Sequence, residues 1–164
     1  MRAISLWQPF ATLLVAGFKI NETRGWPTSY RGPLAIHAAK KWTGELEELC
    51  LTEPFATYLS RLRPNQGGAF YLVDALELIL PRGKVVGIVD VDDCVLVDER
   101  SSAGVLEPER SFGDFTPGRY RWPTSSPRRL REPFDFVGRQ GFFDVPDELI
   151  EAAGEMGPTG GLWG

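Results

Sequence analysis

The segment KVVGIVDVDDCVLVD, which spans residues 84–98, constrains the fold of this chain more than any other feature. It is long and rich in β-branched residues, and its acidic side chains gather toward its second half. Valine and isoleucine fit the pleated surface of a sheet better than they fit a helix. The segment therefore predicts a strand, and other parts of the chain must form the strands that pair with it.

Two further strands, an extended segment and a helix are expected near the N-terminus. The alternating residues 3–9 (AISLWQP) predict a strand that ends at Pro9, which can open a helix because its missing N–H is no loss there. The helix FATLLVAG has an apolar face at helical spacing and closes at Gly17. Residues 18–24 (FKINETR) are extended and polar, and residues 32–39 (GPLAIHAA) predict a buried strand.

The middle of the chain predicts short helices and loops. Thr43 is typical of a helix N-cap before the acidic residues 44–50, and a second short helix is expected after Pro54. Residues 64–83 fit a loop followed by a helix, and residues 98–118 fit loops.

Toward the C-terminus, short strands are expected at Pro133–Val137 and Gly141–Val145, followed by a helical turn from Asp147. We expect one domain over residues 1–154 and a glycine-rich, mobile tail over residues 155–164.

The length of 164 residues fits about one domain, which needs no disulfide or metal to bury a core. Cys50 and Cys94 lie far apart in apolar runs, which favours free thiols in a reducing cytoplasm over a secreted disulfide scaffold. No apolar window reaches the ~18 residues of a membrane-spanning helix, and Pro9 interrupts the stretch that a signal peptide requires. We expect a cytoplasmic protein without a membrane partner.

The sequence lacks the residues that several kinds of catalytic or metal site require. His37 is the single histidine, and with two isolated cysteines it cannot complete a zinc site. Phosphate-loop, dinucleotide and G-x-S-x-G motifs are absent, and a serine triad would have to use His37, for which no serine partner is obvious. We expect Asp90, Asp92 and Asp93 to face water rather than a cation. No metal and no cofactor are therefore expected.

The net charge of −4 is unevenly distributed along the chain. Residues 19–43 carry five basic side chains against one acidic, residues 119–139 carry six arginines against two acidic side chains, and residues 44–118 are strongly acidic. The field at a cleft comes from the nearest charges, so distribution matters more than the total. The two basic blocks fit a site for an anionic ligand, and equally fit scattered arginines that only contact water.

Residues 18–24 combine a lysine, a glutamate and an arginine directly after the predicted helix. Alternate side chains of a strand share a face, so Lys19 would lie opposite to Glu22 and Arg24. Such charges are costly to bury unpaired, so they form either a structural Glu22–Arg24 ion pair or the wall of a polar pocket. Lys19 has no obvious structural partner, and we interpret it as a phosphate or catalytic contact.

Four aromatic residues lie near basic residues in the sequence, namely Trp7, Trp26, Tyr30 and Trp122. Stacking on aromatic rings together with phosphate neutralisation holds single-stranded nucleic acid without a sequence code. Trp7 beside Pro9 is equally compatible with the core, whereas Trp26 in a turn and Trp122 in a basic loop favour exposed roles.

Three ordered motifs lie near the N-terminus, namely S-L-x-Q-P-x-A at Ser5–Ala11, G-x-K-x-x-E-x-R-x-W at Gly17–Trp26, and Y-R-G-x-L-x-I-H at Tyr30–His37. Together they resemble the ASCH family. The motifs G-x-V-x-V-x-D-C at Gly87–Cys94 and G-x-Q-G-F-F at Gly138–Phe143 extend the resemblance over nearly the whole chain. It is the resemblance of a stand-alone, bacterial-type member, and it implies an α+β fold, a PUA-like mixed β-barrel with a few flanking helices.

The resemblance also implies a nucleic-acid-binding domain, with single-stranded RNA or a nucleotide as partner, or DNA as an alternative, in a basic and aromatic cleft. Residues 17–37 would run along one side of the barrel, with Lys19 and Arg24 in one cleft and the two basic blocks side by side. The candidate contacts are Lys19, Arg24, Trp26, Tyr30, Arg31, Lys40, Arg121 and Trp122.

Two alternatives stay open. Some ASCH proteins resemble this chain in Lys19 and cleave an acetyl amide from modified cytidine with a lysine–threonine–glutamate set, and others cleave single-stranded RNA. In the first group the threonine comes three residues after the lysine, where this chain has Glu22, and Thr23 is displaced by one. A metal-independent hydrolase of either kind would use Lys19 and Glu22 as catalytic residues. The second alternative is a protein-interaction adaptor without a nucleic-acid role.

Overall fold

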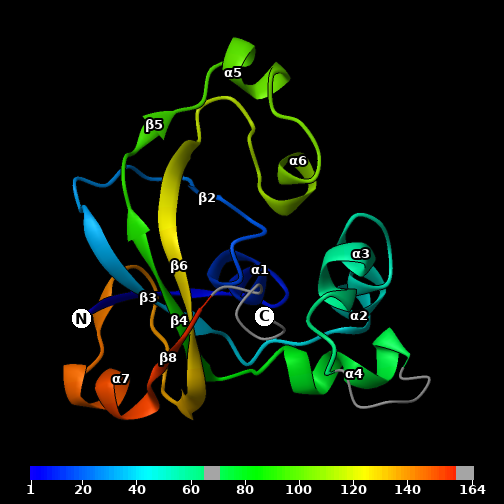
Figure 1. The fold of residues 1–164 in the computed structure, drawn as a ribbon. Coiled ribbons are helices and arrows are strands. Elements are labelled where there is room, and N and C mark those ends of the chain that lie inside the picture. The colour runs from blue at the N-terminus through cyan, green and yellow to red at the C-terminus, as the bar shows by residue number, and fades with distance from the viewer. Residues whose placement is uncertain (65–70, 158–164) are drawn as a thin grey trace.

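The computed structural model describes residues 1–64 and 71–157, which form an α+β fold around one mixed sheet (Figure 1). The strands are β1 (Arg2–Leu6), β2 (Asn21–Arg24), β3 (Gly32–Ala38), β4 (Lys84–Val91), β5 (Val95–Leu96), β6 (Tyr120–Asp135), β7 (Phe143–Asp144) and β8 (Glu155–Met156). The helices are α1 (Phe10–Val15), α2 (Gly44–Cys50), α3 (Phe55–Ser60), α4 (Leu72–Ile79), α5 (Glu99–Ala103), α6 (Glu109–Phe112) and α7 (Asp147–Ala153).

The strand order along the sheet is β2-β6-β4-β3-β1-β7, and β5 and β8 both pair with β6. β1 and β3 run parallel, and the other strand pairs run antiparallel. The expected α+β class is confirmed. Within the described residues no backbone pairing joins β2 to β7, so hydrogen bonds do not close the expected barrel into a ring.

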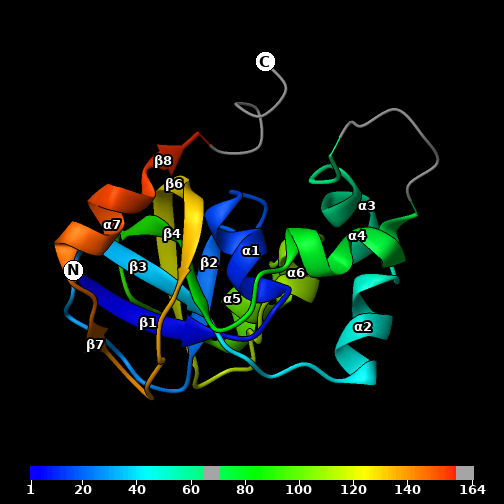
Figure 2. The same ribbon diagram turned by 90° about the horizontal axis from the view of Figure 1, so that it is seen from below.

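β4 has an almost continuous apolar sequence because both faces of the sheet are covered here. Val86 and Val89 belong to the apolar cluster that includes α1, whereas Val85 and Ile88 belong to the cluster that includes α7. Figure 2 shows these two helices on opposite sides of the strands. A strand buried on both faces does not need the polar alternation of a half-exposed one. α1 approaches so closely that a Cβ on Gly87 would lie 2.6 Å from Cβ of Val15.

A third apolar cluster joins α2, α3 and α4 to α1. The predicted N-cap is confirmed, because the side chain of Thr43 accepts a hydrogen bond of 3.2 Å from the amide of Leu46. None of the described helices is long and apolar enough to cross a membrane.

Most of β6 was not predicted from the sequence. Short strand pieces were expected only from Pro133 onward, but a strand of 16 residues runs from Tyr120 to Asp135 between β2 and β4. Its prolines lack the N–H that a regular ladder needs. Pro127 and Pro133 fall where the pairing with β4 shifts register, between Ile88 and Asp90 and between Val85 and Gly87, whereas Pro123 lies opposite Asn21 of β2.

Three further expectations need correction. The long strand predicted over residues 84–98 is interrupted, since β4 ends at Val91 and β5 resumes at Val95. Residues 98–118 contain α5 and α6 rather than loops alone, and α5 begins where the Asp98 side chain accepts a 2.7 Å hydrogen bond from the amide of Ser101. The expected mobile tail begins with β8, which pairs with β6, and residues 158–164 lie outside the described part of the chain.

Trp122 lies in β6 and is completely buried in the α1-side cluster. Replacing Trp122 by alanine removes its packing and leaves a cavity, so we expect a loss of about 3–5 kcal/mol in the free energy of unfolding. Trp7→Ala is the matched control, because Trp7 is 49% exposed and a surface change of this kind costs about 0.5 kcal/mol or less. Urea unfolding of both variants measures the difference, and equal costs would contradict the burial of Trp122.

Candidate functional site

An ion network lies at the start of β2. Lys19 and Glu22 are almost completely buried, and Nζ of Lys19 lies 3.5 Å from Oε2 of Glu22. The other oxygen of the same carboxylate lies 3.0 Å from Nε of Arg24. Lys19 also donates a hydrogen bond to the main-chain oxygen of Asn21. Buried charges require partners of this kind, so one carboxylate balances two cations from the same short segment.

The expected strand alternation is wrong for Lys19. β2 begins only at Asn21, and Lys19 belongs to the turn after α1, in which Gly17 adopts a φ of +79°. The turn places Lys19 beside Glu22, although a regular strand would separate them. The sequence left open whether these charges form a structural ion pair or the wall of a polar pocket. Both hold, because the ion network itself forms part of a polar wall.

Arg24 connects two strands that are not neighbours in the sheet. Its Nη2 donates a 3.0 Å hydrogen bond to the main-chain oxygen of Ser5 in β1. The guanidinium group thus spans the gap between β2 and β1, while Glu22 holds its other side.

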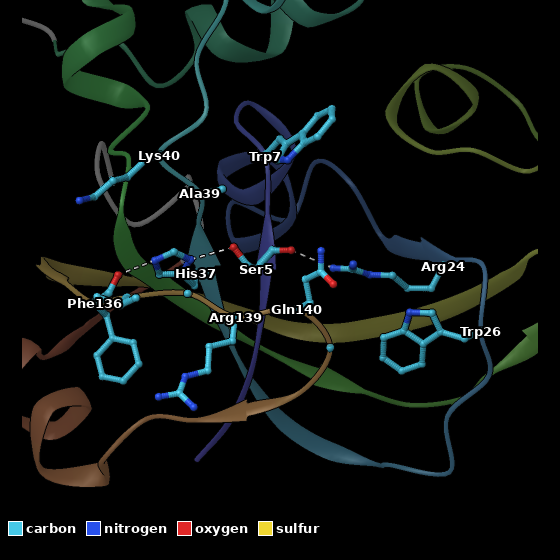
Figure 3. Close-up of a pocket in the computed structure, with 13 residues that line it drawn as sticks. Ser5, Trp7, Arg24, Trp26, His37, Ala39, Lys40, Phe136, Arg139 and Gln140 are labelled. Carbon is cyan, nitrogen blue, oxygen red and sulfur yellow. Dashed lines mark hydrogen bonds between the residues drawn. The ribbon is translucent and has the colours of Figure 1, made fainter.

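Ser5 and His37 lie side by side because β1 and β3 are parallel and in register at these residues. Oγ of Ser5 lies 2.9 Å from Nδ1 of His37, and Nε2 of His37 lies 2.7 Å from the main-chain oxygen of Phe136 (Figure 3). Burial lowers the pKa of His37 below its ordinary value, and the hydrogen bond to Phe136 opposes this only in part. The sequence showed no serine partner for His37, and the structure supplies one.

Both side chains face a cavity with a volume of about 700 Å³, which is called the main cavity below because it joins Ser5 to His37. An adjoining cavity of about 730 Å³ shares Lys40 and Arg139 with it and is also lined by Asp135 and Asp144. The walls of the main cavity come from β1, β2, β3 and the loop after β6, and its lining includes Arg24, Lys40 and Arg139 from three different segments (Figure 3). Among the described residues, no aspartate or glutamate lines it. The cavity is therefore basic in a protein whose net charge is −4. The full lining is Ser5, Trp7, Arg24, Trp26, His37, Ala39, Lys40, Phe136, Val137, Gly138, Arg139, Gln140 and Gly141.

A second cavity of about 360 Å³ lies on the other side of Arg24. It shares Ser5, Trp7 and Arg24 with the main cavity, and its walls include Lys19 and Glu22. Lys19 and Arg24 therefore reach a common cleft, as the sequence predicted. The ammonium group of Lys19 is already held by a carbonyl and a carboxylate, so only a small group that enters this cavity can touch it.

The aromatic residues divide into two groups. Trp7 is 49% exposed at the cavity mouth, where Nζ of Lys41 lies 3.7 Å from the ring centroid. Trp26 lines the main cavity, but it also packs edge-on against Trp122 at 4.9 Å. Trp122 is fully buried rather than in a basic loop, so its expected role as a stacking platform is wrong.

Three of the predicted contacts, Tyr30, Arg31 and Arg121, lie away from both cavities. Tyr30 donates its hydroxyl to the main-chain oxygen of Pro33, and burial raises its pKa above the ordinary value. Arg31 pairs with Asp93 at 3.4 Å, and Arg121 lies 3.4 Å from the side-chain oxygen of Asn21. These residues line neither cavity.

The two basic blocks do meet, since β2 pairs with β6. However, Arg128 pairs with Asp90 at 3.3 Å and Arg119 pairs with Asp114 at 3.3 Å. These carboxylates neutralise arginines of the second block, so the two basic blocks do not form a continuous positive stripe. Asp90 and Asp93, which were expected to face water rather than a cation, pair with Arg128 and Arg31. In the described residues, histidine, cysteine, aspartate and glutamate form no group of three that would hold a metal ion.

Sequence reasoning missed Ser5, Trp7, His37 and Arg139 as members of one site. Ser5 and His37 stood in quoted motifs, and Arg139 lay between the two glycines of the last one. The signal that could have identified these residues is that polar side chains recur inside the quoted motifs. Their meeting depends on the parallel pairing of β1 with β3, which no local pattern specifies.

Comparison with known proteins gives a consistent result. A family model described as the ASCH domain matches residues 4–132. Two solved structures of mutant forms of an ASCH protein from Zymomonas mobilis are similar to this chain, at 16% identity with a TM-score of 0.51 and at 17% identity with a TM-score of 0.50. Both matches cover 92% of this chain and 94% of that chain, and at such identities they show the fold alone. A search of curated proteins found no match.

Replacing Glu22 by glutamine keeps the shape of the side chain but leaves Lys19 buried without its counter-charge. We expect the free energy of unfolding to fall by about 3–5 kcal/mol, the usual cost of breaking a buried ion pair from one side. Glu151→Gln, at an exposed position in α7, should change it by about 0.5 kcal/mol or less. Urea unfolding gives both values, and a silent Glu22→Gln substitution would show that the network carries no stability.

His37 is the only histidine, so its titration can be followed by NMR without assignment of others. We expect a midpoint below 6.5, because burial disfavours the imidazolium. The folded pKa is depressed, so this group contributes stability that is present above about pH 6.5 and is lost as the pH falls through the folded pKa. A midpoint at or above 6.5 would contradict the buried, neutral imidazole.

Proposed function

Because this chain belongs to the ASCH domain family, we propose that it is a nucleic-acid-binding domain and that its ligand is single-stranded RNA or a nucleotide. The observation that carries the proposal is the main cavity, which combines the exposed cations Lys40 and Arg139 with two tryptophans and with Arg24, whose charge Glu22 balances, and which has no carboxylate among its described lining residues. A volume of about 700 Å³ lies within the usual range of roughly 300–1,000 Å³ for small-ligand sites.

The chemistry of the lining fits both parts of a nucleotide. Lys40 and Arg139 are exposed cations that can neutralise a phosphate. Trp7 offers an exposed ring, and stacking of a base on such a ring is worth about 1–3 kcal/mol. Bases in a single strand have free faces, whereas those of a duplex are covered by their neighbours. A single strand therefore fits this site better than a duplex.

A hydrolase built on Lys19 and Glu22 has less support. Both polar contacts of the Lys19 ammonium group are acceptors from its own segment, which is the arrangement of a structural cation. Glu22 is divided between Lys19 and Arg24. The pair therefore fits the role of a scaffold for the cleft better than that of an acid and a base.

Binding in the main cavity should be localised and salt-dependent. We expect Arg139→Gln to weaken binding of a short fluorescein-labelled single-stranded RNA by about tenfold, or ~1.4 kcal/mol. The slope of log affinity against log salt should become shallower by about 0.7 for each phosphate that the variant no longer neutralises. Fluorescence anisotropy over a salt series measures both, with DNA of the same sequence as a second ligand.

Arg100→Gln is the matched control, because it removes the same charge from exposed α5, away from both cavities. It should bind as the wild type does. If both variants lose affinity for RNA equally, the loss reflects the net charge of the protein and not the main cavity. If the wild type binds neither RNA nor DNA at low salt, the protein-interaction adaptor is favoured instead.

A further inference from the structure

We propose that Ser5 is a nucleophile activated by His37, and that the chain hydrolyses carboxylic esters of phosphate-bearing molecules that enter the main cavity. The phosphate part of this inference rests on the proposed function, since the same cations would hold it. The nucleophile itself rests on the hydrogen-bond chain from Phe136 through His37 to Ser5.

The direction of that chain follows from its last acceptor. A carbonyl oxygen can only accept, so Nε2 of His37 must carry the hydrogen that it donates to Phe136 at 2.7 Å. In a neutral imidazole the other nitrogen then has a free lone pair. Nδ1 presents this lone pair to Oγ of Ser5 at 2.9 Å, and the serine hydroxyl is the donor. The roles of base and nucleophile match those in serine hydrolases, but the two ring nitrogens are exchanged and a main-chain carbonyl takes the orienting position.

The imidazole is held firmly in this orientation. His37 is 3% exposed, and burial favours its neutral form, which is the form that a base requires. Gly138 covers it so closely that a Cβ there would lie 2.5 Å from Nδ1 of His37 and 3.1 Å from Oγ of Ser5. Only a glycine permits this approach, and the resulting packing restricts rotation of the ring.

The surroundings of Ser5 suit an ester with an anionic part. Ser5 lines both cavities, so its hydroxyl has space on the side away from His37. The guanidinium group of Arg24 contacts the main chain of Ser5 at 3.0 Å, where positive charge can stabilise an oxyanion formed at the attacked carbonyl. Lys40 and Arg139 line the same cavity and are available to a phosphate.

The reaction then has two halves. Oγ of Ser5 forms a bond to the ester carbonyl carbon while its proton passes to Nδ1 of His37. The bond from that carbon to the alcohol oxygen breaks, and the alcohol leaves with the proton from Nδ1, so that an acyl-serine remains. Water attacks the acyl-serine, gives one proton to Nδ1, and releases the carboxylic acid as the same proton returns to Oγ. No oxidant, metal or cofactor takes part in these steps.

The first test is labelling of the intact wild-type protein with a fluorophosphonate, followed by peptide mass spectrometry. We expect the adduct on Ser5, and this result requires no variant that has to fold. Two substrates then test turnover, p-nitrophenyl acetate as a neutral ester and O-acetyl-AMP as an ester that carries a phosphate. Wild type should hydrolyse both, and Arg139→Gln should lose at least about tenfold in kcat/KM for O-acetyl-AMP only.

Ser5→Ala should abolish hydrolysis of both esters, and His37→Gln should lower it by about 10²–10⁴-fold, the usual contribution of a general base. Ser102→Ala, in α5 and outside both cavities, is the control that should remain fully active. Absence of an adduct on Ser5, or turnover that survives in Ser5→Ala, would overturn the inference. Hydrolysis of p-nitrophenyl acetate without hydrolysis of O-acetyl-AMP would overturn its phosphate part.

RNA binding is measured on the same samples, so the two proposals fail separately. A labelled Ser5 with ester turnover but no RNA binding would refute the proposed function and leave the serine chemistry intact. RNA binding that is equal in wild type and Ser5→Ala, with no ester turnover in either, would refute the serine chemistry and leave the proposed function intact.

Discussion

The carboxylate of Glu22 is the interaction on which the site depends. It lies between Lys19 and Arg24, and through Arg24 it fixes β2 to the main chain of Ser5 in β1. Without it, two cations from one short segment would repel each other in a region of low dielectric constant. The same guanidinium group lines both cavities, so the network that stabilises the gap in the sheet also shapes the cleft. Stability and the geometry of the candidate site are therefore linked through one buried charge.

The basic character of the main cavity arises from where the acidic residues are placed. Arg31, Arg119 and Arg128 each have a carboxylate within 4 Å, so they add little field beyond their own surroundings. Lys40 and Arg139 follow β3 and β6 and line the main cavity, which has no carboxylate among its described residues, while Asp135 and Asp144 line the adjoining cavity on the other side of these two cations. An acidic protein can in this way present a local site for an anion.

Much of the fold could be predicted from local patterns. β1, α1, β3, α2 and the core of β4 lie close to where the sequence placed them, because each has a strong apolar period or a recognisable cap. β6 could not be predicted in the same way. Its prolines and arginines resemble a loop, and Pro127 and Pro133 are tolerated because the pairing with β4 shifts register where they lie. Because β6 was taken for a loop, Trp122 was expected to be an exposed stacking residue, whereas it is buried in the core.

The sequence by itself determined the family, the α+β class and the clustering of Lys19, Glu22 and Arg24, because these depend on residues that are near one another in the chain. Only the tertiary structure decided that Ser5 meets His37, since 32 residues separate them and their contact requires parallel strands in one particular register. It also decided which arginines are neutralised and which line a cavity. Side-chain neighbours across a sheet are set by strand order and register, and neither is encoded in a local sequence period.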